Sequence, residues 1–392
     1  MSVRVSIEPA VLRWALGRTG YDEERLATIF PAAHAWLEGT GKPTLTQARN
    51  LAHRAHIPFG RLLMKHPTGD AISLPDFRTV GSASVTSADN LSPELIDVVK
   101  TCELRLEWYA EFASSSGIPG VTGLGSASLD QSPSRVAKRC RHAFQWDDHT
   151  PIPGSNKVSR LATAMEESGV LVARNSVVNN NTKRPLAVEE FRGFTITRDT
   201  YALVFVNTND SSTAQLFSLA HELGHVLLGI QGISGTPSSF EDETHKRGNV
   251  ETWCNAFAAE FLVPVSSLTQ HAGGKDDELA LISSWARRFG VSREVMLYRW
   301  HEAGLISREK VDALRPLFTS PQSLQKANKR SAHDGGPAFS TLVRFRVGER
   351  FLHAISAAEA SGELSSRDAS RMLGITKAST FDTVIGLVRD YA

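Results

Sequence analysis

Three features that would reveal a function directly are missing from this sequence of 392 residues. It has only three cysteines, Cys102, Cys140 and Cys254, and their wide spacing matches no disulfide framework and no cysteine-based metal motif. No apolar run approaches the ~18 residues that a transmembrane helix requires. The N-terminal residues lack the apolar stretch of a signal peptide. We therefore expect a cytoplasmic protein with reduced thiols and no membrane partner.

A strong charge of either sign is missing as well. The formal net charge is +1, so bulk charge does not indicate a nucleic-acid partner. The apolar content of 41% is ordinary for a globular protein. A chain of this length exceeds what one hydrophobic core usually holds, and we expect two or three domains.

The most informative segment that is present runs from Phe217 to Gly229 and contains His221-Glu222-Leu-Gly-His225. Residues four apart lie on one face of a helix, so the two imidazoles can reach one metal ion. The intervening glutamate then lies beside a water bound to that ion. Two histidines with Glu222 as general base are the arrangement of zinc hydrolases.

A pattern with three fixed positions also arises by chance, and a histidine pair can simply occupy an exposed helix face. The neighbouring residues argue against that explanation, because most of them are apolar and indicate a buried helix. Buried histidine and glutamate need partners, since unpaired polar groups in a protein interior cost several kcal/mol. The sequence therefore favours a metal site over an exposed face.

A third ligand is needed to leave one coordination position open. The metzincin extension is excluded, because Leu228 and Gln231 occupy its glycine and histidine positions. The helix expected over 249–264 offers Glu251 and Glu260, which lie on opposite faces. Glu251 shares its face with Asn255, whose side-chain oxygen can accept the second N–H of a ligand imidazole. This favours Glu251 as ligand.

Four further polar side chains lie between these two helices and can in principle reach a metal ion. They are Glu241, Asp242, Glu243 and His245. A solvated loop is the simpler interpretation of this connection.

Four segments together carry a family resemblance: Phe191-Arg-Gly-Phe, Ala202 to Asn207, Phe217 to Gly229 and Glu251 to Pro264. In this order they resemble the ImmA/IrrE family of zinc metallopeptidases, most specifically over about residues 155–300. The resemblance implies a Zn²⁺ cofactor held by His221, His225 and Glu251, with Glu222 as base. It also implies a zincin-like core in which Asn255 orients a ligand histidine.

The expected fold class is α+β, mostly helical, with a small sheet in the peptidase core and helix-turn-helix-like domains on either side. Strands are expected at 170–173, 191–197 and 201–207, and the edge of their sheet can bind an extended peptide by strand addition. The expected domains are a helix-turn-helix-like domain at 1–66, a linker and helical connection at 67–150, the peptidase domain with a helical extension at 151–317, a linker at 318–337 and a small helical domain at 338–392.

Five short segments of the first 66 residues carry a second resemblance: Val11-Leu-Arg-Trp14, Leu26-Ala27, Trp36-Leu-Glu-Gly39, Pro43-Thr-Leu-Thr-Gln47 and Leu51-Ala52. In this order they resemble a Cro/repressor-type helix-turn-helix domain, whose third helix would read DNA. That helix is expected at 31–38 and offers only His34 and an unfavourable Glu38 to base edges. DNA contact and protein docking both remain open for this domain. Within the connection that follows, Asp76 and Arg78 are expected to tie the linker to a neighbouring domain.

Two functions follow. The first is an intracellular zinc endopeptidase that regulates by cleaving a specific protein partner, such as a repressor. The second is an antitoxin or transcriptional regulator that binds a toxin or DNA, with proteolysis absent or secondary.

Tyr298 and His301 are available to stabilise an oxyanion, although nothing in the sequence ties either to the cleft. Four arginines, at 287, 288, 293 and 299, are expected on a solvated helix surface.

Overall fold

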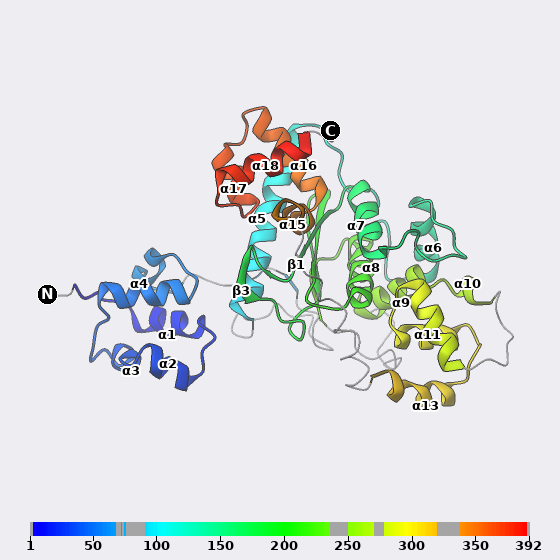
Figure 1. The fold of residues 1–392 in the computed structure, drawn as a ribbon, viewed down its shortest axis with the longest axis horizontal. Coiled ribbons are helices and arrows are strands. Elements are labelled where there is room, and N and C mark those ends of the chain that lie inside the picture. The colour runs from blue at the N-terminus through cyan, green and yellow to red at the C-terminus, as the bar shows by residue number, and fades with distance from the viewer. Residues whose placement is uncertain are drawn as a thin grey trace. The chain divides into compact units, whose positions relative to one another are not determined.

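The computed structural model describes residues 3–67, 72, 74–75, 91–235, 250–269, 278–319 and 338–389 (Figure 1). The chain forms two compact units. The first comprises Met1–Ser73 with Thr86–Lys100, and the second comprises Leu74–Val85 with Thr101–Ala392. The long helix α5 (Pro93–Ser115) contributes residues to both units. Asp76 and Arg78 lie outside the described residues.

The first unit is a small helical domain with its own core. Its elements are α1 (Pro9–Gly17), α2 (Glu23–Ile29), α3 (Ala33–Leu37), α4 (Leu45–Arg54) and the 3₁₀ helix η1 (Phe59–Leu63). Val11, Leu51 and Leu62 are fully buried in its centre. The third helix is shorter than expected, with five residues, and His34 on it contacts Glu38 at 3.3 Å. A helix this short presents little surface to a DNA groove.

A four-stranded mixed sheet forms the centre of the second unit. Its order is β1 (Leu171–Asn175), β5 (Tyr201–Asn207), β4 (Gly193–Arg198) and β6 (Gly232–Ser234). Strand β1 is parallel to β5, whereas β4 is antiparallel to both β5 and β6. The three expected strands are therefore present. Strand β6 and the hairpin β2 (Val177–Val178) to β3 (Asn181–Pro185) were not expected.

Helices surround this sheet, and the α+β fold class is confirmed. They are α6 (Pro133–Ala143), α7 (Lys157–Glu167), α8 (Ser212–Leu228), α9 (Val250–Leu262), α10 (Val265–Thr269), α11 (Glu278–Phe289), α12 (Arg293–Glu302), α13 (Arg308–Thr319), α15 (Phe339–Val347), α16 (Glu349–Ala360), α17 (Ser366–Met372) and α18 (Ala378–Arg389). Among the described residues, none of the helices combines the length and apolar character needed to cross a membrane.

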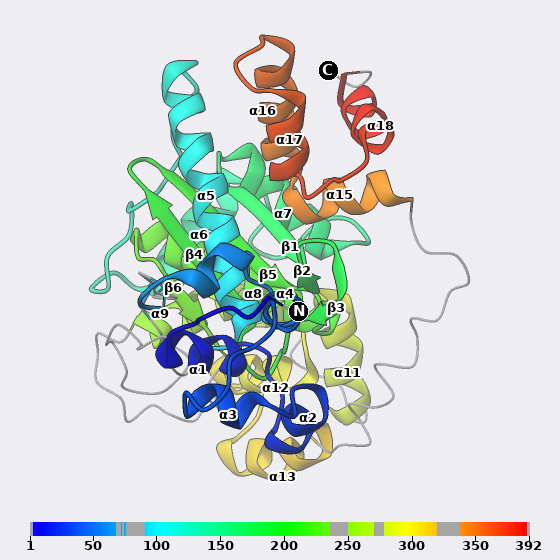
Figure 2. The ribbon, with the colours of Figure 1, turned by 90° about the vertical axis from the view of Figure 1, so that its left-hand side faces the viewer.

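Helix α8 packs between the sheet and helix α9 (Figures 1 and 2). Its ends are defined by local chemistry: the Ser211 hydroxyl accepts from the Ala214 N–H, and Gly229 ends the helix in the left-handed region at φ 68°. Gly224 allows α9 to approach closely. A Cβ atom there would lie 3.2 Å from Cys254 Sγ and 3.3 Å from Phe257 Cδ1.

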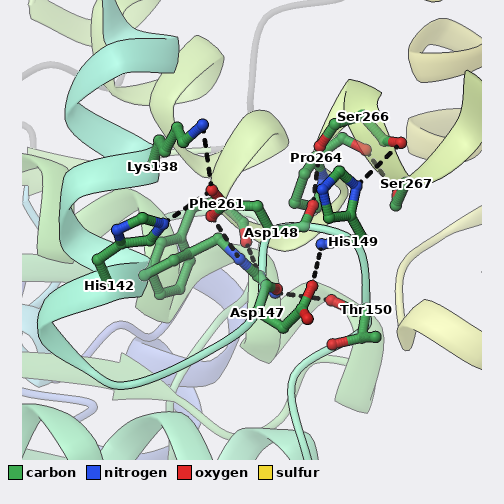
Figure 3. Close-up of polar contacts among 11 residues, drawn as sticks. Lys138, His142, Asp147, Asp148, His149, Thr150, Phe261, Pro264, Ser266 and Ser267 are labelled. Carbon is green, nitrogen blue, oxygen red and sulfur yellow. Dashed lines mark hydrogen bonds and ion pairs between the residues drawn. The ribbon is translucent and has the colours of Figure 1, made fainter.

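The C-terminal end of α9 is anchored by the buried guanidinium of Arg141 on α6. It donates to the carbonyl oxygens of Phe261 and Thr150, both at 2.6 Å, and to that of Asp147. Figure 3 shows this cluster, in which the Asp148 carboxylate also contacts His142 at 2.9 Å. One cation thus ties α9 to the loop that follows α6.

The C-terminal helices dock on the sheet edge formed by β1. The Arg174 guanidinium lies over the Phe345 ring at 4.0 Å, and a Cβ at Gly348 would lie 2.5 Å from the Val172 oxygen. The Glu166 carboxylate on α7 accepts from the Arg350 N–H at 3.1 Å, at the first turn of α16. Burial raises the pKa of Glu166 to about 7, even though the backbone N–H groups of Arg350 and Glu349 and the charge of Arg174 favour the ionised form of the carboxyl group.

We expect Arg141→Met to lower the free energy of unfolding by roughly 3 kcal/mol, because buried carbonyl oxygens lose their donor. Urea denaturation followed by circular dichroism measures this change. The matched control is Arg135→Met at an exposed position of the same helix, which should stay within about 0.5 kcal/mol of the parent. Equal stability of the two variants would refute the anchoring role of Arg141.

The raised pKa of Glu166 predicts a pH-dependent stability. The folded-state pKa of Glu166 is about 7, above the ordinary value of 4.5. The contribution of the protonated Glu166 carboxyl group to the free energy of unfolding is therefore complete below pH 4.5 and is lost as the pH rises through 7. The loss amounts to at most about 3 kcal/mol. Unfolding free energies of the parent and Glu166→Gln at pH 5 and pH 8 isolate the effect. The glutamine variant should lose less stability than the parent, and parallel losses would contradict the prediction.

Candidate functional site

His221, Glu222 and His225 lie in the last turns of α8 and are all buried. Both imidazoles face the same point, with their Nε2 atoms 3.2 Å apart. Two ring nitrogens at this distance compete for one proton or share one cation. The four-residue spacing of the two histidines therefore places both Nε2 atoms close to one point, where they can act together as nitrogen donors.

Glu251 meets this pair from the first turn of α9. Its Oε1 lies 3.0 Å from His225 Nε2, and its Oε2 lies 3.2 Å from His221 Nε2. Zinc binds nitrogen and oxygen donors at ~2.0–2.1 Å, so two ligands of a tetrahedral site are separated by about 3.3 Å. Contacts of 3.0 to 3.2 Å among the three side chains match one face of such a tetrahedron. The residues present fit a zinc ion.

The charges at this point also favour a cation. Burial raises the pKa of Glu251, but the adjacent His221 and His225 outweigh burial and lower it to about 2. Burial lowers the pKa of His221, but Glu251 outweighs that effect and raises it to about 9. The protein alone therefore holds a proton between an imidazole and a carboxylate. A metal ion that binds here displaces that proton.

Cys254 lies next to the two imidazoles, although no cysteine spacing in the sequence indicated it. Its Sγ and the two histidine nitrogens lie within 4.8 Å of one another, which makes Cys254 an alternative to Glu251 as third donor. Burial raises the pKa of this thiol well above its usual range, and the charges of Glu251 and Glu222 add to the effect. A ligand thiol must be deprotonated, whereas Glu251 is already ionised. Glu251 is therefore the better donor.

Asn255 lies one turn after Glu251 on the same face of α9. Its Oδ1 accepts from His221 Nδ1 at 2.9 Å. This contact holds the hydrogen on Nδ1 and leaves Nε2 for a metal ion, as outer partners of ligand histidines generally do. The pairing expected from the sequence is thus present, although the roles of these side chains stay predictions.

Strand β4 positions Glu222 through two residues, Thr195 and Gly193, to which the sequence analysis gave no role in the site. The Thr195 hydroxyl donates to Glu222 Oε2 at 2.7 Å. A Cβ at Gly193 would lie only 2.9 Å from Glu222 Oε1, so no larger residue fits there. Glu222 Oε1 is buried and makes no hydrogen bond to the residues that the structure describes. On β6, the Ser234 hydroxyl lies 3.5 Å from His225 Nε2.

Other sequence candidates lie elsewhere. Glu260 pairs with Arg299, so it is not available as the third ligand. Arg299 is itself buried, which corrects the expectation that it belongs to a solvated helix surface. The His301 ring contacts the Ile306 oxygen at 3.0 Å. Tyr298 is buried in the hydrophobic core. Glu241, Asp242, Glu243 and His245 lie outside the described residues.

The sheet edge nearest the site is β6, because Ser234 on this strand lies beside His225. The Ile233 N–H on this strand donates to the Pro75 oxygen at 3.0 Å. That peptide group is therefore already paired within the chain. Strand addition at this point of β6 requires residue 75 to move aside.

Comparison with known families places this site inside a recognised domain. Residues 165–301 match the Peptidase_M78 family model, described as the IrrE N-terminal-like domain. This match includes the whole of α8 and α9 and supports a metallopeptidase type of hydrolase, for which a metal ion is implied. Residues 347–385 match a domain of unknown function, DUF8813. No curated protein matches the chain.

Neither match includes the N-terminal residues. The helix-turn-helix resemblance of the first unit, and with it a DNA-binding role, therefore stays a prediction.

We expect Asn255→Ala to weaken zinc binding by about 10- to 100-fold, because His221 loses the acceptor that orients its ring. Competition with a chromophoric chelator measures the dissociation constant. Asn255→Asp keeps an acceptor oxygen and should stay close to the parent. Unchanged affinity in Asn255→Ala would show that this contact does not orient a metal ligand.

Proposed function

We propose that this chain is a zinc-dependent endopeptidase that regulates by cleaving a specific protein partner. The observation that carries the proposal is the convergence of His221, His225 and Glu251 beside the buried Glu222 carboxylate. The match of the surrounding residues to a metallopeptidase family supports the same reaction class.

The chain's own residues supply positioning and proton transfer. A bound zinc ion would contribute Lewis acidity towards a water molecule and the scissile carbonyl group. Glu222 accepts the proton of the attacking water, and the hydrogen bond from Thr195 fixes the orientation of its carboxylate. Burial raises the pKa of Glu222. A carboxyl group with a raised pKa holds a proton more readily and can return it to the leaving amine.

The first unit favours a second function, the docking of a protein partner that need not be cleaved. Two neighbouring apolar side chains are exposed there, Leu63 at 53% and Met64 at 45%. The short α3 offers few groups for reading bases. A toxin or repressor held by this unit is the partner class that we propose, and DNA is the alternative.

The metal assignment predicts that protein purified without added zinc contains one zinc ion per chain. His221→Ala and His225→Ala should each lose the metal, because tight binding needs all three protein donors. Inductively coupled plasma mass spectrometry of the purified variants measures the number of zinc ions per chain. Full zinc occupancy in both histidine variants would refute the ligand assignment.

The base assignment predicts that Glu222→Gln keeps the metal but cleaves about 10²- to 10⁴-fold more slowly. This variant also serves as bait, since it should retain a bound partner. The captured protein is then incubated with the zinc-loaded parent or with the variant, and new termini are identified by mass spectrometry. Glu309→Gln, at an exposed position on α13, should cleave like the parent.

Two results would count against this function. Equal cleavage by the parent and Glu222→Gln would exclude Glu222 as base. A captured partner that the zinc-loaded parent leaves intact would favour the binding function instead.

A further inference from the structure

Two residues that follow the first unit in the chain, Leu74 and Pro75, lie at the outer edge of the sheet in the second unit. Strand β6 is last in the order of the described strands and pairs with β4 on its inner side. On its outer side, the Ile233 N–H donates to the Pro75 oxygen at 3.0 Å. Pro75 therefore occupies the position that a peptide added to β6 would take.

This point of the edge lies beside the candidate metal centre. Ser234 follows Ile233 on β6, and its hydroxyl lies 3.5 Å from His225 Nε2. Ser234 is also in register with Gly193, where a Cβ atom would lie 2.9 Å from Glu222 Oε1. Neighbouring strands of a sheet lie ~4.8 Å apart. A peptide added to β6 at this point therefore passes one strand spacing from a residue that contacts the metal donors.

Burial of Leu74 holds the segment in place. This residue is only 2% exposed, and Ile233 on β6 is fully buried. A leucine that is removed from water contributes substantially to the stability of the arrangement that covers it. The position of the segment at the edge is therefore supported by packing as well as by the hydrogen bond from Ile233.

The proline at position 75 limits how the segment can pair with β6. Proline has no backbone N–H, so residue 75 accepts a backbone hydrogen bond but cannot donate one. Prolines at sheet edges are a common means of blocking further strand pairing. A peptide residue with an N–H at this position can offer β6 a donor that Pro75 lacks. The segment therefore covers the edge and can be displaced by a peptide that pairs more fully.

The segment competes with free peptides because it belongs to the same chain as β6. The effective concentration of a tethered segment commonly reaches the millimolar range. A free peptide that has micromolar affinity for the uncovered edge therefore binds much more weakly while the segment is in place. Release of the segment removes this competition.

We propose that Leu74 and Pro75 form an autoinhibitory strap, which occupies the peptide-binding edge of β6 and keeps an extended protein substrate away from the metal centre. The inference rests on the proposed peptidase function, because it concerns the access of a peptide to that same site. Release of the strap frees the Ile233 N–H. The substrate then pairs with β6 in place of residue 75.

Leu74→Asp tests whether the strap can be released, because a carboxylate is strongly disfavoured at a buried position. Hydrogen exchange of the full chain, read by mass spectrometry with electron-transfer fragmentation, follows the Ile233 amide. We expect this amide to exchange about tenfold faster than in the parent, while exchange in β5 at the sheet centre stays unchanged. If β5 also exchanges faster, the milder Leu74→Ala replaces Leu74→Asp in every comparison. Leu104→Asp, the same substitution at a leucine that is 65% exposed, is the matched control and should leave the Ile233 amide protected.

Peptide binding tests whether the uncovered edge is a peptide site. The probe is a fluorescein-labelled peptide with the sequence of residues 70–79, and the zinc-loaded Glu222→Gln chain is used so that the peptide stays intact. Fluorescence anisotropy should show about tenfold tighter binding when Leu74→Asp is added to this chain, because the strap no longer competes. The same peptide carrying Leu74→Asp should not bind.

Cleavage of the partner captured by the Glu222→Gln bait measures the inhibition itself. At substrate concentrations below KM, zinc-loaded Leu74→Asp should cleave this partner about tenfold faster than the zinc-loaded parent. Leu104→Asp should cleave at the parent rate.

Three outcomes would overturn the proposal: equal exchange of the Ile233 amide in the parent and Leu74→Asp, equal peptide affinity with and without Leu74→Asp, or equal cleavage rates of the parent and Leu74→Asp. The third outcome leaves the peptidase function intact, because the partner is still cleaved. Absence of cleavage by every zinc-loaded form refutes the peptidase function instead, and the exchange and binding results still decide whether residue 75 occupies the edge.

Discussion

The close contact between α8 and α9 is the constraint on which the candidate metal centre depends. It brings the Glu251 carboxylate within 3.2 Å of two imidazoles on the neighbouring helix. Gly224 favours this approach, because a Cβ atom there would lie 3.2 Å from Cys254 Sγ and 3.3 Å from Phe257 Cδ1, closer than most Cβ contacts. Ionisable groups buried so deeply are tolerated only when they are paired with each other or with a metal ion.

The surrounding structure holds that contact in place from both sides. Arg141 and the Arg299–Glu260 pair fix the C-terminal end of α9. Strand β4 holds Glu222 through Thr195 and through the absence of a side chain at Gly193. A metal site tolerates displacements of only a few tenths of an ångström, so these supports on regular elements matter as much as the donors themselves.

The C-terminal helices form a second region of this unit, where they pack against strand β1. The C-terminal helices cover the β1 edge of the sheet, and a buried carboxylate from α7 accepts an amide at the start of α16. This arrangement protects an otherwise open strand edge. A cavity of 720 Å³ lies between α5, α7 and α16, and its lining combines apolar side chains with both acidic and basic ones. The metal centre and this cavity share helix α7 as a common neighbour, since α7 packs on α8 and also lines the cavity.

The parts of the site that the sequence made predictable are those governed by local helical geometry. His221 and His225, like Glu251 and Asn255, are four residues apart, and helix periodicity alone places each pair on one face. The strand and helix periods likewise indicated the three long strands and the α+β class. The short strand β6 carries too few residues for a pattern, and α3 proved shorter than its flanking residues indicated.

Only the tertiary structure decided which side chains far apart in the chain would meet. Thr195 reaches Glu222 across 27 positions, and Arg299 neutralises Glu260 across 39. Cys254 joins the imidazoles, and Glu166 joins residues 184 positions away. Backbone geometry fixes neighbours within a helical turn, whereas the approach of distant segments is set by packing of the whole core. The sequence by itself therefore determined the candidate donors and their spacing, and the packed fold determined which side chains they contact.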